Sequence, residues 1–375
     1  EPVCDACHRD DREGRGLVKA RYIAFLPGGG RLPFASAEMV TEERDIPRDA
    51  YLALDLDGGS GGLPGTPVVG RFIARHVPLD GEGNIVEFTA LAARSRGRTA
   101  LAYLKADVDN LGLIFGGGLR GEGGDRRSIS RLATLSRSLE LFFGGHVQAL
   151  GCEKDIYTVY SGGDDLLVIG PWSTLVEFAV RLREDFARFT CGNPSWGLSA
   201  GLAVAGHHTP VLTAAEETED RLHGAKHTPG PRIVPWPPGA EAGGGECGKD
   251  RLVAMGTSIP WDYVPGLLAD AERLVRWLEE EKLSTGQVRR LLSYADLYQE
   301  WQRTGDMRAF RYAPLLVYDL KRNWANAPPE ALEWARELTL RDSEKMPALR
   351  FICEYALYGA RGAAVTGAAA IGSRG

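Results

Sequence analysis

The chain has 375 residues, of which 44% are hydrophobic and 25% are charged, as is typical of soluble globular proteins with two or three domains. Its formal charge of -6 does not favour nucleic-acid binding by bulk electrostatics, so any RNA contact has to be local or made through a partner subunit. No stretch approaches the roughly 18 consecutive apolar residues of a membrane span, and no charged-then-apolar leader opens the chain. We therefore expect a cytoplasmic protein without a membrane partner.

Residues 1–15 contain a CxxC pair, Cys4 and Cys7, whose spacing suits two thiolate ligands of a structural zinc ion. A tetrahedral site needs two more ligands, for which His8 and residues upstream of Glu1 are candidates. Two free thiols in a loop explain the pair equally well. We expect a partial zinc-knuckle linker. The start at Glu1, without a methionine and with half a metal motif, also suggests a fragment.

Residues 16–98 predict a small β-rich linking module, because short β-branched or apolar runs alternate with Gly/Pro turns. Asp55 and Asp57 flank Leu56 next to glycines, and we interpret them as part of a solvated loop, since no further acid completes a metal site. The expected strands are Tyr22 to Leu26, Tyr51 to Leu56, Val68 to Ile73 and Ile85 to Ala90.

Residues 99–250 predict an α+β domain with the order β-α-β-β-α-β-α, which is the ferredoxin-like arrangement plus one helix. Apolar side chains recur at steps of three and four between Ile129 and Leu150, and Thr174 with Glu177 predicts a capping box at the start of the second helix. The remaining elements are a strand from Thr99 to Ala106, a hairpin from Asp155 to Gly170, a strand from Trp196 to Ala205 and a helix from Pro210.

The hairpin turns at Gly162-Gly163-Asp164-Asp165, which places two adjacent carboxylates at its tip. In an antiparallel sheet with the order 4-1-3-2, the end of the first strand lies at the same edge as this turn, so Asp107 is expected to meet Asp164 and Asp165. Converging carboxylates repel one another unless cations lie between them, and Mg²⁺ or Mn²⁺ prefers such oxygen ligands. A solvated Gly-Gly-Asp-Asp turn is the alternative.

This arrangement suits a two-metal nucleotidyl transfer, in which one metal activates a hydroxyl and the other holds a triphosphate. Asp107, Asp164 and Asp165 are the expected catalytic residues and metal ligands. The glycines of the hairpin let a nucleotide approach the backbone, and the segment after Asp109 has N–H groups for phosphates. The expected nucleotide-binding residues are Val108, Asp109, Asn110, Gly112, Ser161, Gly162, Gly163 and Lys226.

Beyond a Pro/Gly-rich segment that ends at Asp250, residues 251–361 predict an all-α domain, and residues 362–375 a flexible Gly/Ala-rich tail. Ser284 and Gln287 predict a capping box within the all-α domain. We assign its tryptophans to packing before base stacking, and we regard two arginine pairs as candidate RNA or subunit contacts, although an exposed arginine pair is more often a solvated helix face. These residues are Trp277, Trp301, Trp324 and Trp334, and the pairs Arg126-Arg127 and Arg289-Arg290.

Four consecutive motifs between about residues 94 and 227 resemble the second Palm domain of the large subunit of type III CRISPR effector complexes, most closely the III-A type. They are ALAYLKADVDNLGLIF, ISRLATLSRSLELFF, YSGGDDLLVIG and LSAGLAVAGHHTPVLTAAEETEDRLHGAKH. The helical region and the CxxC pair are more loosely similar to that subunit's C-terminal domain and zinc-binding linker. The HD nuclease and first Palm domains of the full-length subunit are not in this chain.

The resemblance implies a Palm domain of the GGDEF and adenylyl cyclase type, with Asp107, Asp164 and Asp165 at the family's metal positions. It implies conversion of ATP into cyclic oligoadenylates when a complex with CRISPR RNA and other type III subunits binds target RNA. Two other functions stay open: an inert scaffold subunit of the same ribonucleoprotein, and a free-standing GGDEF-type dinucleotide cyclase. The second is disfavoured because Asp165 stands where those enzymes have glutamate.

Overall fold

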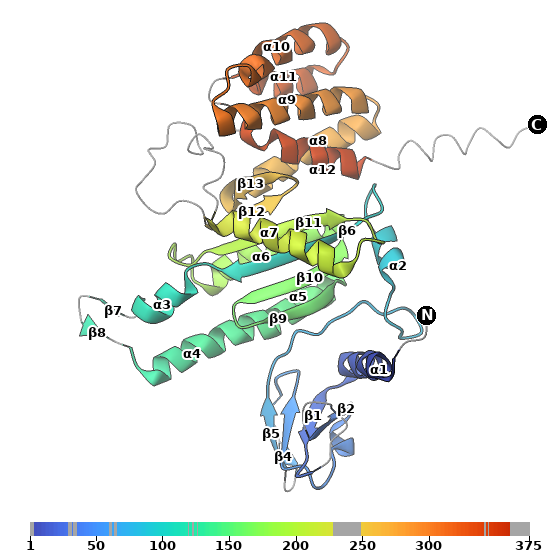
Figure 1. The fold of residues 1–375 in the computed structure, drawn as a ribbon, viewed down its shortest axis with the longest axis vertical. Coiled ribbons are helices and arrows are strands. Elements are labelled where there is room, and N and C mark those ends of the chain that lie inside the picture. Colours follow the sequence, from blue (N-terminus) through green and yellow to red (C-terminus); the bar gives the residue numbers. More distant parts are fainter. Residues whose placement is uncertain are drawn as a thin grey trace, which may run out of the picture. The chain divides into compact units, whose positions relative to one another are not determined.

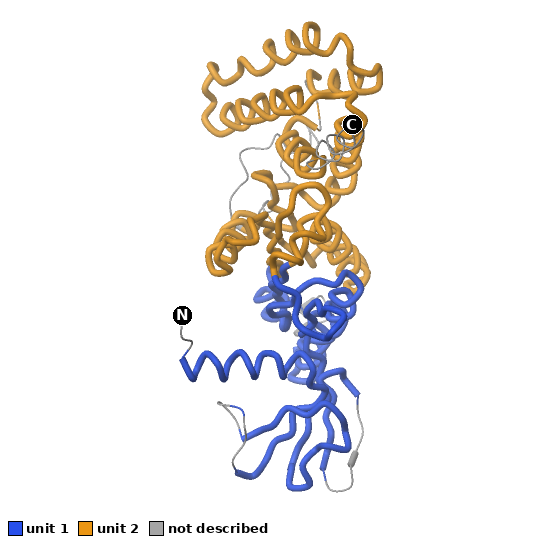
Figure 2. The backbone as a smooth tube through the Cα atoms, turned by 90° about the vertical axis from the view of Figure 1, so that its right-hand side faces the viewer, with its two compact units in different colours: residues 1–87, 110–169 blue, residues 88–109, 170–375 orange. Residues whose placement is uncertain are grey.

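The computed structural model describes residues 4–28, 32, 36–59, 62–63, 66–118, 120–121, 124–125, 127–227, 249–340, 343 and 345–360. The chain divides into two compact units, one of residues 1–87 and 110–169 and the other of residues 88–109 and 170–375 (Figure 2). Within the described ranges, no helix combines the length and the hydropathy that crossing a membrane would require.

The N-terminal part of unit 1 is a helix and a five-stranded sheet with the order β2-β1-β3-β5-β4. β1 pairs antiparallel with both β2 and β3, and alternating residues such as Tyr22 and Ala24 point into a small apolar core. The β-rich character is confirmed, and the helix at residues 5–19 was not expected. The elements are α1 (Asp5–Lys19), β1 (Tyr22–Phe25), β2 (Ala37–Val40), η1 (Glu43–Asp45), β3 (Leu52–Asp55), β4 (Gly62–Leu63) and β5 (Thr66–Gly70).

Two expectations for this region are wrong. Asp55 does not lie in a solvated loop: it is 3% exposed and pairs with Arg21, whose nitrogen lies 3.4 Å from the carboxylate. Its neighbour Asp57 pairs with Arg75 at 2.9 Å. Ile85 to Ala90 does not form a strand either, because Phe88–Ala93 is helix α2, which buries Leu91 and Ala92. A short apolar run does not by itself distinguish a strand from a buried helical turn.

The rest of unit 1 supplies the first helices and the hairpin of the expected ferredoxin-like domain. The long helix between Ile129 and Lys154 contains a π-helical turn at Leu141–His146, which separates its two α-helical parts. The elements are α3 (Leu111–Gly117), β7 (Arg120–Gly121), β8 (Gly124–Asp125), α4 (Ile129–Glu140), η2 (Leu141–His146), α5 (Val147–Lys154), β9 (Tyr157–Gly162) and β10 (Asp165–Pro171), of which β10 runs on into unit 2.

The larger sheet has the strand order β13-β12-β11-β6-β10-β9. Strands β6, β9, β10 and β11 are the first to fourth strands of the expected ferredoxin-like domain, so the predicted order 4-1-3-2 is confirmed. In unit 2, β6 pairs antiparallel with β11 along its whole length. The elements of this part are β6 (Leu101–Val108), α6 (Trp172–Phe189), β11 (Leu198–Ala205), α7 (Val211–His227), β12 (Arg251–Ala254) and β13 (Thr257–Pro260).

Helix α7 lies across β11 and β6 (Figure 1). The approach to β11 is close, because a Cβ on Gly201 would lie 2.4 Å from the backbone nitrogen of Leu222 and 2.5 Å from the carbonyl oxygen of Thr218. No other residue fits at position 201 without moving the helix. Helix α6 also packs against β6 and β11 and buries the Leu175 and Phe178 side chains. The end of β6 is therefore held between packed elements.

The start of α6 differs from the expectation. The capping box at Thr174 is wrong, since the helix begins two residues earlier, at Trp172. The Trp172 backbone N–H donates to Ser95 Oγ at 3.2 Å, and its indole N–H donates to the Arg96 and Arg98 carbonyl oxygens, both at 3.0 Å. These tertiary bonds, rather than a local cap, fix the first turn.

The described residues between Trp261 and Gly359 form helices, as expected, and α12 packs against α8 and α9. The strands β12 and β13 precede it where helix was expected. The capping box of Ser284 and Gln287 is confirmed at the start of α9. The helices are η3 (Trp261–Tyr263), α8 (Val264–Glu279), α9 (Thr285–Thr304), η4 (Ala309–Arg311), α10 (Tyr312–Asn323), α11 (Pro329–Glu337), η5 (Met346–Ala348) and α12 (Leu349–Gly359).

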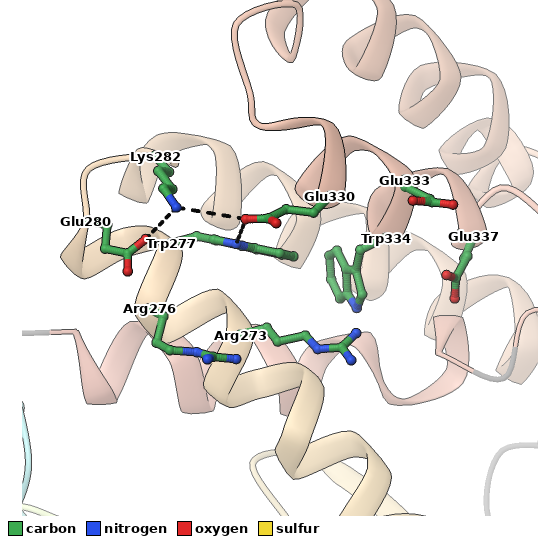
Figure 3. Close-up of a pocket in the computed structure, with 9 residues that line it drawn as sticks. All are labelled: Arg273, Arg276, Trp277, Glu280, Lys282, Glu330, Glu333, Trp334 and Glu337. Carbon is green, nitrogen blue, oxygen red and sulfur yellow. Dashed lines mark hydrogen bonds and ion pairs between the residues drawn. The ribbon is translucent and has the colours of Figure 1, made fainter.

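The packing role of the tryptophans is confirmed for Trp277, Trp324 and Trp334, which are 7%, 0% and 2% exposed. Trp277 and Trp334 contact each other edge to face, and both line a pocket of about 500 Å³ between α8 and α11 (Figure 3). The Trp277 indole N–H donates to Glu330, which Lys282 also approaches. The described lining of the pocket mixes arginine and lysine with four glutamates, so it favours neither an anionic nor a cationic ligand.

Candidate active site

Asp107 lies near the end of β6, on the sheet face that α7 covers. It forms an ion pair with Lys226, in the last turn of α7, and the two side chains are 27% and 18% exposed. Two residues earlier on the same strand face, Lys105 pairs with Glu219 of the same helix. The two ion pairs link α7 to the strand with opposite polarity, and Lys226 neutralises the Asp107 carboxylate.

Asp109 follows the strand and is buried, with 1% of its surface exposed. Its carboxylate accepts hydrogen bonds from Ser199 Oγ, at 2.8 and 3.0 Å, and from the Asp250 backbone N–H at 2.8 Å. Burial raises the pKa of Asp109, and these two donors oppose the rise. The carboxylate is thus engaged inside the protein, whereas Asp107 remains partly open to solvent. A nucleotide contact of Asp109 stays a prediction.

The residues after Asp109 form a tight turn into helix α3. Asn110 adopts a left-handed conformation with φ 56°, and its carbonyl oxygen accepts the Ile114 N–H at 3.0 Å. Gly112 lies in the first turn of the helix, and a Cβ there would meet nothing within 4 Å. Val108, by contrast, is 2% exposed, so only its backbone could meet a nucleotide. Phosphate contacts of this turn stay a prediction.

The hairpin forms as expected, with Asp165 paired to Gly162 and a register shift between Leu167 and Val168. Gly163 has φ 68°, which glycine adopts without a Cβ penalty, and neither Gly162 nor Gly163 has an atom within 4 Å of an added Cβ. A nucleotide would therefore find open space at the turn.

Side chains next to the turn are tied to neighbouring elements. The Tyr160 hydroxyl donates to Asp165 at 3.3 Å, and Ser161 Oγ donates to the Phe143 carbonyl oxygen at 2.7 Å. Asp164 and Asp165 are both half-buried. Asp107 belongs to unit 2 and these two aspartates to unit 1, so their convergence and their joint binding of Mg²⁺ or Mn²⁺ stay predictions.

Three residues that contact β6 or the residue after it were not identified from the sequence: Glu219, Ser199 and Asp250. Periodicity places Glu219 and Lys226 seven residues apart on α7, a spacing that points to one helix face. Ser199 sits on an apolar strand where a hydroxyl needs a buried partner, which is a signal that was available. No local pattern marks Asp250, because only the tertiary fold brings it to Asp109.

The CxxC pair caps the first helix. Cys4 is the N-cap of α1, and its Sγ lies 3.3 Å from that of Cys7. Hydrogen bonds from Cys7 lower the pKa of the Cys4 thiol, and the bond between the two side chains raises the pKa of Cys7, so the geometry favours one thiolate of the two that a CxxC zinc site uses. Across the described ranges, no three His, Cys, Asp or Glu side chains cluster closely enough to hold a metal ion. Zinc binding stays a prediction, in which Cys4 and Cys7 would supply two of the ligands.

One arginine of each predicted basic pair contacts another part of this chain. Arg290 forms an ion pair with the buried Asp319, at 3.1 Å. Arg127 donates to the Gly116 carbonyl oxygen at 3.0 Å, while its neighbour Arg126 lies outside the described residues. Part of the proposed RNA-facing charge therefore serves the fold, and RNA contacts stay predictions.

Comparison with known proteins places this geometry in a family. Residues 100–232, from β6 past α7, match the family model described as Cas10/Cmr2, second palm domain. Residues 100–232 are thus a Cas10-type second palm domain, and the chain as a whole is similar to the Cas10/Csm1 subunits of type III-A CRISPR systems. The Cas10-type palm match spans both the strand that carries Asp107 and the hairpin that carries Asp164 and Asp165.

Two curated Cas10/Csm1 relatives illustrate the match; both are named as single-strand-specific deoxyribonucleases of CRISPR subtype III-A. The Thermococcus onnurineus protein is 28% identical over 86% of this chain and 42% of its own length. The Methanocaldococcus jannaschii protein is 38% identical over 39% of this chain and 20% of its own length. This chain thus spans less than half of these Cas10/Csm1 relatives.

Solved structures of Csm1–Csm4 assemblies share the fold. The apo Csm1–Csm4 cassette has a TM-score of 0.69 at 22% identity, covering 95% of this chain and 50% of that chain. The Csm1–Csm4 subcomplex of the type III-A CRISPR-Csm interference complex has a TM-score of 0.68 at 23% identity, with the same coverage. At this identity the likeness establishes the architecture, helical part included.

Proposed function

We propose that this chain is the cyclase part of a type III CRISPR effector subunit, which converts ATP into cyclic oligoadenylates when the complex binds target RNA. The observation that carries the proposal is the Cas10-type palm domain with Asp107 at the end of β6 and Gly-Gly-Asp-Asp at the hairpin turn. Related Csm1–Csm4 cassettes have been solved with ATP, with pppApApA and with cA4, and these complexes support ATP as the substrate and oligoadenylates as the products of this chain.

The donor set fits hard divalent cations, since Asp107, Asp164 and Asp165 offer only carboxylate oxygens and all three are partly open to solvent. When bound, Mg²⁺ or Mn²⁺ would lower the pKa of the attacking ribose hydroxyl and neutralise the departing pyrophosphate. Lys226, which now neutralises Asp107, would offer its charge to the triphosphate. The open backbone at Gly162 and Gly163 would admit the nucleotide.

A scaffold role is the second candidate, and the Asp107–Lys226 ion pair favours it, because that pair also explains Asp107 as a structural residue. The two functions differ in product. We expect the chain, assembled with CRISPR RNA and the other type III subunits, to form cyclic oligoadenylate from ATP and Mg²⁺ or Mn²⁺ only when target RNA is added, as measured by mass spectrometry. Formation of cyclic di-GMP from GTP without RNA would instead indicate a free-standing GGDEF-type cyclase.

A matched pair of variants isolates the hairpin. Asp164→Asn with Asp165→Asn keeps the shape of the turn and removes its charge, so product should fall by at least about 100-fold if these carboxylates hold the metal. Asp10→Asn with Asp11→Asn makes the same change in an exposed adjacent pair on α1 and should leave product unchanged. Equal product from both double variants would contradict the proposal and leave the scaffold role.

A further inference from the structure

A network of hydrogen bonds joins four elements just beyond the end of β6. Besides its bonds to Asp109, Asp250 binds Arg183 of α6 through both carboxylate oxygens, at 2.8 and 2.7 Å. Its Oδ1 also accepts the Leu198 N–H at 3.0 Å, at the start of β11. Asp250 has φ 57° and directly precedes β12. The network therefore ties the starts of β11 and β12 and helix α6 to the residue that follows β6.

Ser199 connects this network to Asp107. It is fully buried, and in the antiparallel pairing of β11 with β6 it is the direct partner of Asp107. Directly opposed residues point to the same face of a sheet, so Ser199 and Asp107 share the α7 face. Ser199 Oγ nevertheless donates to Asp109, two residues along. The Ser199 hydroxyl thus links the β11 residue that pairs with Asp107 to Asp109, the residue that follows β6.

The backbone around the network leaves little freedom. The Asp109 N–H donates to the Gly197 carbonyl oxygen at 2.9 Å. A Cβ on Gly197 would lie 2.6 Å from the Asp109 carboxylate and 3.1 Å from Asp250 Cβ, so the side chains fill the space that glycine leaves. A buried and fully bonded carboxylate in such a space is costly to shift, because any displaced donor loses its partner.

We propose that Asp109, Ser199 and Asp250 are positioning residues, which hold the end of β6 so that the Asp107 carboxylate stays where a metal and Lys226 can use it. The inference rests on the proposed function and assigns these residues no contact with ATP. In this proposal the two aspartates of the Asp107-Val108-Asp109 segment have different roles. The Asp107 carboxylate takes part in the reaction, and Asp109 holds the strand end that carries Asp107. A displacement on the order of 1 Å at a catalytic carboxylate can lower the rate up to about 100-fold.

The test compares Ser199→Ala, Asp109→Asn and the combined variant in the assembled complex. Ser199→Ala removes the connecting hydroxyl without touching a charge, and Ser293→Ala, on the exposed face of α9, is the matched control. We expect each single variant to lower kcat about ten-fold and to leave KM for ATP within about two-fold, with little further loss in the combination, because one network is broken either way. Hydrogen exchange of the peptide 105–110 should quicken in both variants and not in the control.

Other outcomes decide against the inference. If Asp109→Asn raises KM and Ser199→Ala does nothing, Asp109 contacts the nucleotide directly and the positioning role is wrong. If neither variant changes kcat, the network is structural only. If the wild-type complex makes no cyclic product, the proposed function fails. Hydrogen exchange then tests whether the network holds the end of β6. Unchanged exchange of peptide 105–110 in Ser199→Ala overturns that inference, and faster exchange supports it.

Discussion

Trp172 offers the sharpest test of how the strand leading to Asp107 is anchored. Its fully buried ring meets Tyr355 and Tyr358 of α12 edge to face, with centroids 5.2 and 5.7 Å apart, and its N–H bridges the carbonyl oxygens of Arg96 and Arg98, just before β6. Replacing it by phenylalanine keeps an aromatic ring and removes the donor. The change therefore isolates the anchor of the segment that enters β6.

The expected loss in the free energy of unfolding has two parts. Leaving two partly buried carbonyl oxygens without their donor costs about 1–2 kcal/mol. The smaller ring leaves a cavity of about 40 Å³, which at about 24 cal/mol per Å³ adds about 1 kcal/mol. Trp172→Phe should thus lower the unfolding free energy by about 2–3 kcal/mol, as measured by urea titration followed by circular dichroism.

The matched control is Trp196→Phe. Trp196 is half-buried and meets Phe186 at 6.4 Å, and its indole N–H has no hydrogen bond to any described residue. That variant should lose less than about 1 kcal/mol. If Trp172→Phe costs no more than Trp196→Phe, the bridging N–H does not anchor the segment and the reasoning is refuted.

Three further predictions concern single side chains. Burial raises the pKa of Glu354 in the folded protein despite Arg350 at 3.0 Å, so wild-type stability should rise as the pH falls from 7 towards that pKa; Glu354→Gln should be the more stable protein at pH 7, and its advantage should shrink by pH 5 in urea titrations. Burial also raises the pKa of the Cys353 thiol, so iodoacetamide should label the exposed Cys191 and spare Cys353 in the folded protein, as mass spectrometry would show. Lys226→Met should raise KM for ATP at least about ten-fold through the lost phosphate contact, whereas the exposed Lys321→Met should not change it.

Much of the palm architecture follows from patterns that are local in sequence. The alternation in the strand that ends at Asp107 and the glycine turn before Asp164 predict strand and hairpin, and the order of elements then predicts the order 4-1-3-2. Helix α7 is likewise expected from the proline at its start. These patterns do not distinguish a strand from a buried helical turn in a short apolar run. Phe88–Ala93, for example, overlaps an expected strand and forms a helix.

The details of the site depend on contacts between distant segments. The sequence predicted a nucleotide contact for Asp109, yet the fold buries its carboxylate against Ser199 and Asp250, which lie 90 and 141 positions further along. Lys226 was expected to meet phosphate, and in the structure it neutralises Asp107. A local pattern does not identify either partner, because each contact forms only once β11 has paired with β6 and β12 and once α7 has packed on the sheet.

The central claim is that Asp107 and the hairpin carboxylates form one metal site, and anomalous diffraction from Mn²⁺ tests it most directly. Crystals of the chain in its type III complex, soaked with AMPPNP and Mn²⁺, should show an ion coordinated by Asp107 together with Asp164 or Asp165, at about 2.0–2.3 Å, and Lys226 turned from Asp107 to the phosphates. Bound nucleotide with Asp107 still paired to Lys226, and no manganese at the hairpin, would contradict the account.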